Sequence, residues 1–428
     1  MKKIVLWIIL PLMLIGIVAA QEINPGDVAW VATAAVLVML MTPALGFFYA
    51  GLVRRKNLVS TLIQCLIIFS IVSLIWTLWG YSMAFGPSIK GFIGDLSYFG
   101  LRGVGIEPNV LYAATIPALL FFFFQLKFAA ITPALIIGAF AERIKFKALI
   151  IFIVLWVTFI YTPLAHWVWN SGGWLRHIGA VDFAGGTVVH IAAGLSALAA
   201  AIVIGRRKDH GNGEFKPNNI PYVILGASLL WFGWFGFNAG SALAANGLAI
   251  SALVVTNVAA ASGAVSWMVV DWVMKGKPSA VGISIGAVCG LVAITPASGY
   301  VNALAAIVIG AVAGILSNLI ANWRTTRTKL DDSLDVFACH GVSGIWGSLA
   351  TGLFASVAVN SAGVNGLFYG NPHQLLVQSI AVVVVAAYAF IGSFIILKAM
   401  GLFMNIRVSR KEEEKGLDKS QHGEEAYT

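Results

Sequence analysis

Long apolar runs alternate with short polar segments along almost the whole chain. Several runs exceed the roughly 18 to 20 apolar residues that cross a bilayer core, and none shows the ten-residue alternation of a membrane β-barrel. The pattern therefore predicts an all-α membrane protein with eleven spans. They are expected at residues 28–53, 58–85, 120–142, 148–168, 183–205, 219–242, 250–274, 279–297, 302–323, 335–358 and 374–402.

Basic residues mark every second connection between these spans. The clusters lie at residues 54–56, 143–147, 206–208, 275–277, 324–329 and 407–411, whereas the alternating connections hold only Lys90, Arg102 and Arg176. Cytoplasmic loops carry an excess of Lys and Arg. The distribution predicts a multi-pass protein of the cell (inner) membrane with its N-terminus outside and its C-terminus in the cytoplasm, which an odd number of spans also requires.

The two ends of the chain differ from the spans between them. Residues 1–20, with two lysines, an apolar run and a small-residue end, are typical of a cleaved signal peptide; a retained first helix is the alternative. Residues 21–402 form the predicted transmembrane domain. Residues 403–428 are polar and charged, without an apolar face to bury, which favours a solvated cytoplasmic tail.

Two histidines, His190 and His340, lie inside predicted spans five and ten. An ionisable group in hydrocarbon costs several kcal/mol unless a partner or a water-filled cavity relieves it. Spans one to five and six to ten begin on opposite sides of the membrane, as in an inverted 5+5 repeat with a final helix added. We expect this repeat to bring the two histidines together in a polar path.

Composition narrows the function classes. The chain is 59% hydrophobic and 11% charged, with a mean hydropathy of +0.88, against about 25% charged residues in soluble domains. The net charge of +9 reflects the basic loops and not nucleic-acid binding. The three cysteines, Cys65, Cys289 and Cys339, fit no metal motif and are expected as buried small side chains.

The side chains available in the spans favour a small solute. Neutral imidazoles offer a hydrogen-bond donor and an acceptor, and no carboxylate ring or arginine cluster for an ion is present in the spans. Ammonia and water fit this path. Histidines without a nucleophile, a metal-ligand set or a cofactor motif argue against an enzyme, and neither a cofactor nor a metal is expected.

Aromatic and acidic residues near the predicted outer ends allow two interpretations each. The aromatic residues suit an interfacial belt, the interpretation that composition favours, or a cage for a small cation; they are Phe121–Phe124, Phe128, Trp169, Trp234, Phe235 and Phe237. Asp182 is expected to cap span five through the Gly185 N–H or to provide negative potential near a cation. Asp335 is expected to cap span ten likewise.

Five stretches, in the same order along the chain, resemble the ammonium transporters of the Amt/Mep/Rh family, close to bacterial Amt proteins. They are TPALGFFYAGLVRRKN (42–57), FAAITPALIIGAFAERIKF (128–146), DFAGGTVVHI (182–191), WFGFNAGSALAAN (234–246) and DVFACHGVSGIWG (335–347). The resemblance covers nearly the whole chain after residue 20. It implies a homotrimer of eleven-helix subunits in the lipid bilayer, each subunit with its own pore for ammonium or ammonia.

The resemblance also assigns roles to residues of this chain. Trp169, Phe128 and Ser241 would form an outer ammonium site, with Asp182 stabilising it near the pore mouth. Phe128 and Phe237 would stack as a gate, and His190 and His340 would line the pore. Lys127 departs from this pattern as a cation within a span; it is expected to extend to the outer interface, or else to weaken ammonium recruitment.

The tail resembles the family too. In RVSRKEEEKGLDKSQHGEEAY (407–427), the residues Gly416, Leu417 and Asp418 match a regulatory element. The resemblance implies that the tail and inner loops receive a PII-type signal protein that plugs the pore. Two other functions stay open: a sensor that binds ammonium with little flux, and a channel for a neutral gas.

Overall fold

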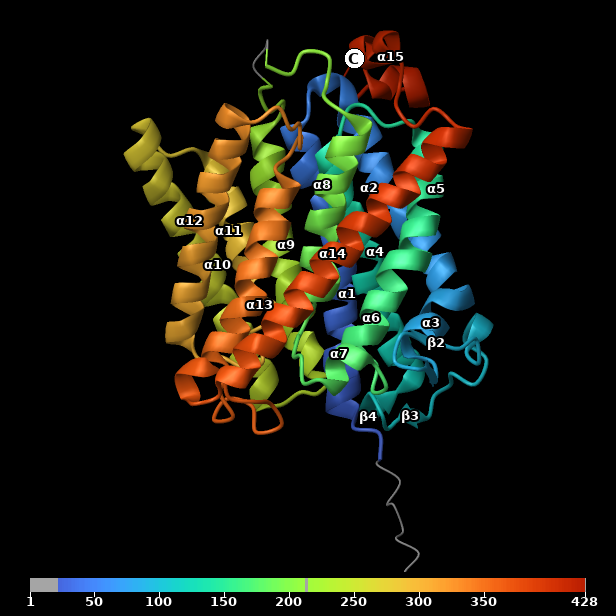
Figure 1. The fold of residues 1–428 in the computed structure, drawn as a ribbon, viewed down its shortest axis with the longest axis vertical. Coiled ribbons are helices and arrows are strands. Elements are labelled where there is room, and N and C mark those ends of the chain that lie inside the picture. Colours follow the sequence, from blue (N-terminus) through green and yellow to red (C-terminus); the bar gives the residue numbers. More distant parts are fainter. Residues whose placement is uncertain (1–21, 212–214, 428) are drawn as a thin grey trace, which may run out of the picture.

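The computed structural model describes residues 22–211 and 215–427, which fold as a bundle of long helices (Figure 1). Nine helical segments within these residues are long and apolar enough to cross a membrane: Pro25–Leu52, Arg55–Phe85, Ala118–Phe140, Phe146–His177, Gly186–Ile204, Ile220–Ala242, Gly247–Lys275, Ala303–Arg327 and Pro372–Phe403. The signal peptide predicted at residues 1–20 lies outside the described residues.

These segments are built from the following elements. The helices are α1 (Pro25–Leu52), α2 (Leu58–Ile75), α3 (Tyr81–Phe85), α4 (Ala118–Ile136), α5 (Phe146–Trp156), α6 (Thr162–Trp169), α7 (Trp174–His177), α8 (Ala192–Ile204), α9 (Ile220–Ala239), α10 (Gly247–Lys275), α11 (Ala280–Ile294), α12 (Ala303–Arg327), α13 (Ser343–Phe354), α14 (Pro372–Phe403) and α15 (Arg410–Lys415). The strands are β1 (Ser88–Ile89), β2 (Ile93–Gly94), β3 (Pro108–Asn109) and β4 (Ala113–Pro117), in two antiparallel pairs, β1–β2 and β3–β4.

Polar residues placed just before the apolar runs start several of the long helices. The Asn24 side chain accepts from the Gly26 N–H at 2.8 Å, and Pro25 begins α1 with the fixed φ that a first turn needs. Asn246 and Asn302 cap α10 and α12 in the same way. Each cap satisfies an N–H group that the helix leaves without a partner.

The two remaining expected spans are shorter than the sequence pattern suggests. Helix α11 covers 15 residues within the expected span 279–297. The expected span 335–358 is a π-helical turn, Phe337–Val342, followed by the 12-residue α13. Both pack inside the bundle, where α11 contacts α9, α10, α12 and α13. The structure thus confirms a mostly helical membrane fold, with nine long apolar helices among the described residues.

Small residues let the helices approach closely. A Cβ atom on Gly226 of α9 would lie 2.3 Å from the Phe48 nitrogen of α1, and one on Gly310 of α12 would lie 2.2 Å from the Ala259 oxygen of α10. Within a membrane, helix association depends on such close packing because lipid tails are as apolar as leucine. Replacing these glycines would separate the pairs that form the framework of the bundle.

The first and last described residues lie at opposite ends of the bundle (Figure 1). Helix α15 lies at the end that we call the tail end. The two strand pairs and α7 lie at the other end, which we call the mouth end. This arrangement agrees with an odd number of crossings between the two described termini.

The tail is packed against the bundle, which corrects the solvated tail expected from its composition. Leu417 is 1% exposed and Asp418 is 2% exposed. The Arg407 backbone pairs with Ile144, and the Leu417 N–H donates to the Asn57 side chain at 2.8 Å. Composition misled because polar side chains and backbone groups, and not an apolar face, provide most of these contacts.

Candidate functional site

A pocket opens at the mouth end, which we call the vestibule. Its volume is about 240 Å³, and its lining includes Phe128, Trp169, Asp182 and Ser241. The Trp169 ring meets the Phe128 ring edge to face at 5.9 Å between centroids, and the Trp169 indole N–H donates to the Asp182 carbonyl at 3.0 Å. The aromatic faces and the Ser241 hydroxyl therefore share one cavity, as a cage for a small cation requires.

Two phenylalanines close the inner side of the vestibule. The rings of Phe128, from α4, and Phe237, from α9, stack with centroids 4.2 Å apart and planes inclined by 27°. They are 1% and 0% exposed. Phe128 lines the vestibule, and Phe237 lines a second cavity on the other side of the ring pair. The ring pair therefore separates the two spaces.

The second cavity, which we call the pore cavity, contains both predicted histidines. The Nδ1 atoms of His190 and His340 are 3.3 Å apart, and both side chains are almost fully buried. The cavity is narrow, with a volume of about 10 Å³, close to what one water molecule needs. Its other lining residues are Met41, Leu45, Phe48, Ile131, Leu135, Val189, Leu230, Trp234, Phe237 and Val288.

Within the described structure, the Nε2 atom of His190 is buried without a hydrogen-bond partner. The Trp234 ring stacks on the imidazole at 5.4 Å, and the Trp234 indole N–H is already donated to the Thr295 hydroxyl at 2.9 Å. A buried polar atom in a native protein usually has a partner. This nitrogen is therefore available to a small hydrogen-bonding solute in the pore cavity.

Asp182 fixes the backbone that carries His190. Its Oδ1 accepts from the Gly185 and Gly186 N–H groups at 2.8 and 2.7 Å, and its Oδ2 accepts from the Thr187 N–H at 2.8 Å. These bonds start the π-helical turn Gly186–Ile191. The expected cap is confirmed, with more N–H groups than the single one at Gly185. Asp182 is 7% exposed and still borders the vestibule.

The cap of the second histidine segment corrects an expectation. Asp332, and not Asp335, accepts from the Val336 and Phe337 N–H groups, at 3.1 and 2.7 Å. Asp335 has a φ of +55° and its carboxylate pairs with Arg324 at 2.8 Å. The capping carboxylate precedes the histidine by eight residues in both segments, from Asp182 to His190 and from Asp332 to His340.

Glycine allows the two histidine segments to cross in contact. A Cβ atom on Gly194 of α8 would lie 2.2 Å from the Gly341 nitrogen and 2.3 Å from its Cα. The residue after His340 is thus packed against the helix that follows His190. A larger residue at position 194 would push the two segments apart and with them the two imidazoles.

Lys127 does not extend to the outer interface, which corrects the favoured expectation. It is 2% exposed, and its ammonium group lies over the rings of Phe123 and Phe69, 3.5 and 5.2 Å from their centroids. It borders neither the vestibule nor the pore cavity. Cation–π contacts with side chains of α2 and α4 hold the cation inside the bundle instead.

The predicted regulatory residues lie where the tail meets the connection between α1 and α2. The Asp418 carboxylate accepts from the Ser60 and Val59 N–H groups at 2.7 and 3.1 Å and so caps α2. Gly416 has a φ of +95°, and a Cβ atom there would lie 2.5 Å from Lys56. Burial raises the pKa of Asp418 above its ordinary value. These three residues dock the tail.

The sequence alone did not single out Trp234 as a site residue. Composition favours an interfacial belt for this residue, with a cation cage as the alternative, yet it is 2% exposed and packs on His190. The available signal was its position three residues before Phe237, which places both rings on one helix face. The belt interpretation is wrong for Phe128, Trp234 and Phe237, because all three are buried.

Comparison with known sequences gives matches over almost the whole chain. A sequence profile described as the Ammonium Transporter Family matches residues 29–427. A protein named ammonium transporter Amt1, from Archaeoglobus fulgidus, is 50% identical over 405 residues, which cover 95% of this chain and 100% of that protein. An ammonium transporter from Bacillus subtilis is 47% identical over 406 residues, covering 94% and 98%.

Solved structures match in the same way. The crystal structure of Mep2 from Candida albicans superposes with a TM-score of 0.86 at 37% identity, covering 92% of this chain and 88% of that one. A structure titled "Sensor Amt Protein" has a TM-score of 0.86 at 32% identity, covering 93% and 98%. The chain that carries this fold, the vestibule and the histidine pair is therefore similar over most of its length to ammonium transporters.

Proposed function

The chain belongs to the ammonium transporter family, and on that premise we propose that it recruits NH4⁺ in the vestibule, deprotonates it and passes NH3 through the pore cavity. The single observation that carries this proposal is the contact of His190 and His340 in a narrow, otherwise apolar cavity behind a stacked ring pair. The relatives are transporters and not enzymes.

The vestibule suits a small cation. The aromatic faces of Trp169 and Phe128 attract a cation by about 0.5 to 2 kcal/mol. The Ser241 hydroxyl donates to the Phe237 carbonyl at 2.8 Å, which leaves its oxygen lone pairs free to accept from a solute. Ammonium has N–H groups to donate and potassium has none, so Ser241 favours ammonium over a cation of similar size. Asp182 adds negative charge at the same pocket.

Passage beyond the ring pair favours the neutral species. A charge in an apolar cavity costs far more than a neutral polar molecule, and the pore cavity has space for about one small molecule. Deprotonation of NH4⁺ gives NH3 and a proton. The NH3 takes hydrogen bonds from the imidazoles while Phe128 and Phe237 act as the gate. The proton returns to the vestibule or follows a separate route along histidine and water.

We infer a complete architecture of eleven crossings in an inverted 5+5 repeat plus α14. The equal eight-residue spacing between each capping aspartate and its histidine supports the repeat. In this architecture α11 and the Phe337–Phe354 segment are the two crossings added to the nine long ones. The mouth end faces outward, the tail end faces the cytoplasm of a cell with an inner membrane, and residues 1–20 are a cleaved signal peptide.

Two partners complete this proposal. Three copies of the chain form a homotrimer, each with its own pore, as the family resemblance implies. A PII-type signal protein binds the tail end, where Gly416, Leu417 and Asp418 dock the tail beside the connection between α1 and α2. The docked tail supports this second partner, because it creates a defined surface next to the inner loops.

A sensor is the second candidate function, favoured by the match to the structure titled as a sensor. We would distinguish the two with purified protein in proteoliposomes, by recording currents on a solid-supported membrane after an ammonium jump and after a potassium jump. An ammonium-specific current means that net charge moves. Uptake detected by internal pH without current means neutral ammonia conduction. Binding without either signal means a sensor and would refute the transport proposal.

A further inference from the structure

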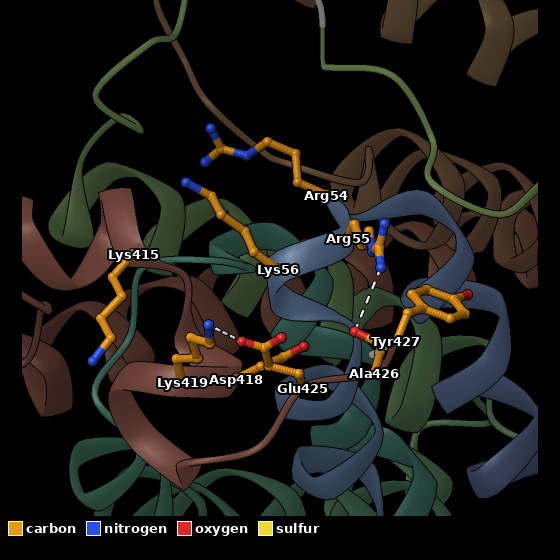
Figure 2. Close-up of a pocket in the computed structure, with 9 residues that line it drawn as sticks. All are labelled: Arg54, Arg55, Lys56, Lys415, Asp418, Lys419, Glu425, Ala426 and Tyr427. Atoms are coloured by element: carbon orange, nitrogen blue, oxygen red, sulfur yellow. Dashed lines mark hydrogen bonds and ion pairs between the residues drawn. The ribbon is translucent and has the colours of Figure 1, made fainter.

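A basic cavity lies at the tail end, between the connection from α1 to α2 and the tail (Figure 2). Its volume is about 440 Å³, which is within the range of small-molecule sites. Five of its lining side chains are cationic and two are acidic. The lining comprises Arg54, Arg55, Lys56, Lys415, Asp418, Lys419, Glu425, Ala426 and Tyr427.

Internal contacts already use both carboxylates and two of the cations. The Asp418 carboxylate accepts from the backbone of α2. Glu425 pairs with Lys419 across the tail (Figure 2). Arg54 pairs with the buried Glu142 at 2.6 Å, outside the cavity lining. These groups hold the walls of the cavity and leave no acidic side chain of the lining free.

Three cations remain without a carboxylate partner among the described residues: Arg55, Lys56 and Lys415. Arg55 donates to the Tyr427 carbonyl at 3.4 Å and lies over the Tyr427 ring. Lys56 donates to the Glu414 carbonyl at 2.7 Å. Both contacts are with neutral groups, and the lining holds five cationic side chains against two acidic ones, so the cavity carries an excess of positive charge.

We propose that this cavity binds a phosphate-bearing anion through Arg55, Lys56 and Lys415. A guanidinium binds phosphate oxygens in a bidentate manner, and an ammonium group adds a point charge. The same chemistry is presented by a free phosphate or diphosphate group and by a phospholipid headgroup. Neither source depends on ammonium transport, so this proposal stands apart from the proposed function.

Because the three cations come from two segments, an anion bound to them would also affect the docking of the tail. Arg55 and Lys56 belong to the connection after α1, whereas Lys415 belongs to α15 of the tail (Figure 2). An anion held by both sides bridges the two segments and relieves the repulsion between them. By linkage, the anion stabilises the docked state of the tail, and docking of the tail strengthens anion binding by the same free energy.

Binding to the full-length protein tests the proposal with two probes. Inorganic pyrophosphate is titrated calorimetrically into protein in a neutral detergent. Retention of phosphatidylglycerol over phosphatidylcholine is measured by native mass spectrometry. The cavity variant carries Arg55→Gln and Lys415→Gln. The matched control carries Arg410→Gln and Lys411→Gln, which remove two exposed cations from the same short helix outside the cavity lining.

We expect the cavity variant to weaken binding of one probe by about tenfold or more, and the control by less than about threefold, because a charge-assisted contact is worth about 1.5 kcal/mol or more. Loss with pyrophosphate identifies a free phosphate group, and loss with the lipid identifies a headgroup. Binding of neither probe to the unmodified protein, or equal losses in both variants, overturns the proposal. The exposed Lys415→Gln change alone provides the same comparison if the double variant does not fold.

Discussion

The Nδ1 atoms of His190 and His340 face each other at 3.3 Å. A neutral imidazole has one N–H and one bare nitrogen, so this contact requires one ring to donate and the other to accept. The donating ring then presents a bare Nε2, and the accepting ring presents an Nε2–H. The pore cavity therefore offers an acceptor at one end of the pair and a donor at the other.

Replacing His190 should impair conduction. His190→Ala removes the Nε2 atom that is available to the solute in the pore cavity, and a lost hydrogen bond of about 1 to 1.5 kcal/mol corresponds to about a tenfold slower passage. Ammonium-specific uptake and current in proteoliposomes measure the effect. The exposed His373→Ala serves as the control. Undiminished selective ammonium currents in His190→Ala would refute the histidine path.

The Asp182 carboxylate should stabilise the fold as well as the vestibule. In Asp182→Asn an amide NH2 faces the Gly186 or Thr187 N–H groups, which both need an acceptor. We expect a loss of about 1 to 3 kcal/mol, seen as a lower thermal unfolding midpoint in detergent. Asp209→Asn, at an exposed ion pair, should change little. An unchanged midpoint together with a higher half-saturation concentration for ammonium would restrict Asp182 to an electrostatic role.

Two tail glycines provide a matched test of docking. Gly416 and Gly423 both have positive φ, +95° and +73°, but a Cβ atom would clash with Lys56 only at position 416, since no atom lies within 4 Å at 423. Gly416→Ala should therefore release the tail, and limited proteolysis should cut it faster. Gly423→Ala bears backbone strain of about 1 kcal/mol alone. Equal cleavage of the two variants would contradict this docking geometry.

The buried Asp332 should make stability depend on pH. Burial, and then the neighbouring Asp335 carboxylate, raises the pKa of Asp332 to about 6, whereas an unfolded aspartate ionises near pH 4. The folded state thus holds this proton over a range in which the unfolded state has lost it. The contribution of Asp332 is fully present below about pH 4 and is lost as the pH rises to about 6.

Asp332→Asn should remove this dependence, because the amide does not ionise. The melting midpoints of the unmodified protein and the variant are measured from pH 4 to pH 7. As the pH rises, the midpoint of the unmodified protein should fall relative to that of the variant. Titrating groups that do not interact with Asp332 contribute equally to both proteins and cancel in that difference. A difference that stays constant with pH would show that Asp332 is ionised throughout.

Lys127 should have no part in ammonium recruitment. Its ammonium group lies over Phe123 and Phe69 and outside the vestibule. Lys127→Met keeps an unbranched side chain, one atom shorter, and removes the charge, so the half-saturation concentration for ammonium should stay within about twofold, a change of about 0.4 kcal/mol. Uptake at graded ammonium concentrations measures it. A clearly higher affinity would show that the cation repels substrate.

The lengths of the apolar runs predicted most of the helices, and the positions of His190 and His340 in two halves that start on opposite sides of the membrane predicted their meeting. The thickness of the bilayer sets the length of an apolar run that can cross it. Two histidines at equivalent positions of a repeat leave few arrangements other than a contact between them. The same pattern overestimated the regular length of 279–297 and 335–358. There, turns and a π-helical segment interrupt the helix without a change in residue type, because tertiary packing and the Asp332 cap determine where each helix begins.

Other features depend on partners that are distant in the sequence. Asp335 and Asp332 both precede an apolar run, and Arg324 on α12 decides between them by pairing with Asp335. Lys127 stays buried because Phe69, on another helix, lies within reach. The tail docks through backbone N–H groups of α2, which leave no trace in the composition of the tail itself.

The cap that Asp418 places on α2 has a consequence for synthesis of the chain. The Ser60 N–H and its acceptor are 358 residues apart. At about 5 to 20 residues per second, the ribosome needs about 20 to 70 s to make the residues between them. The start of α2 therefore waits for its partner while nearly all the other helices are made, and this end of the protein is completed last.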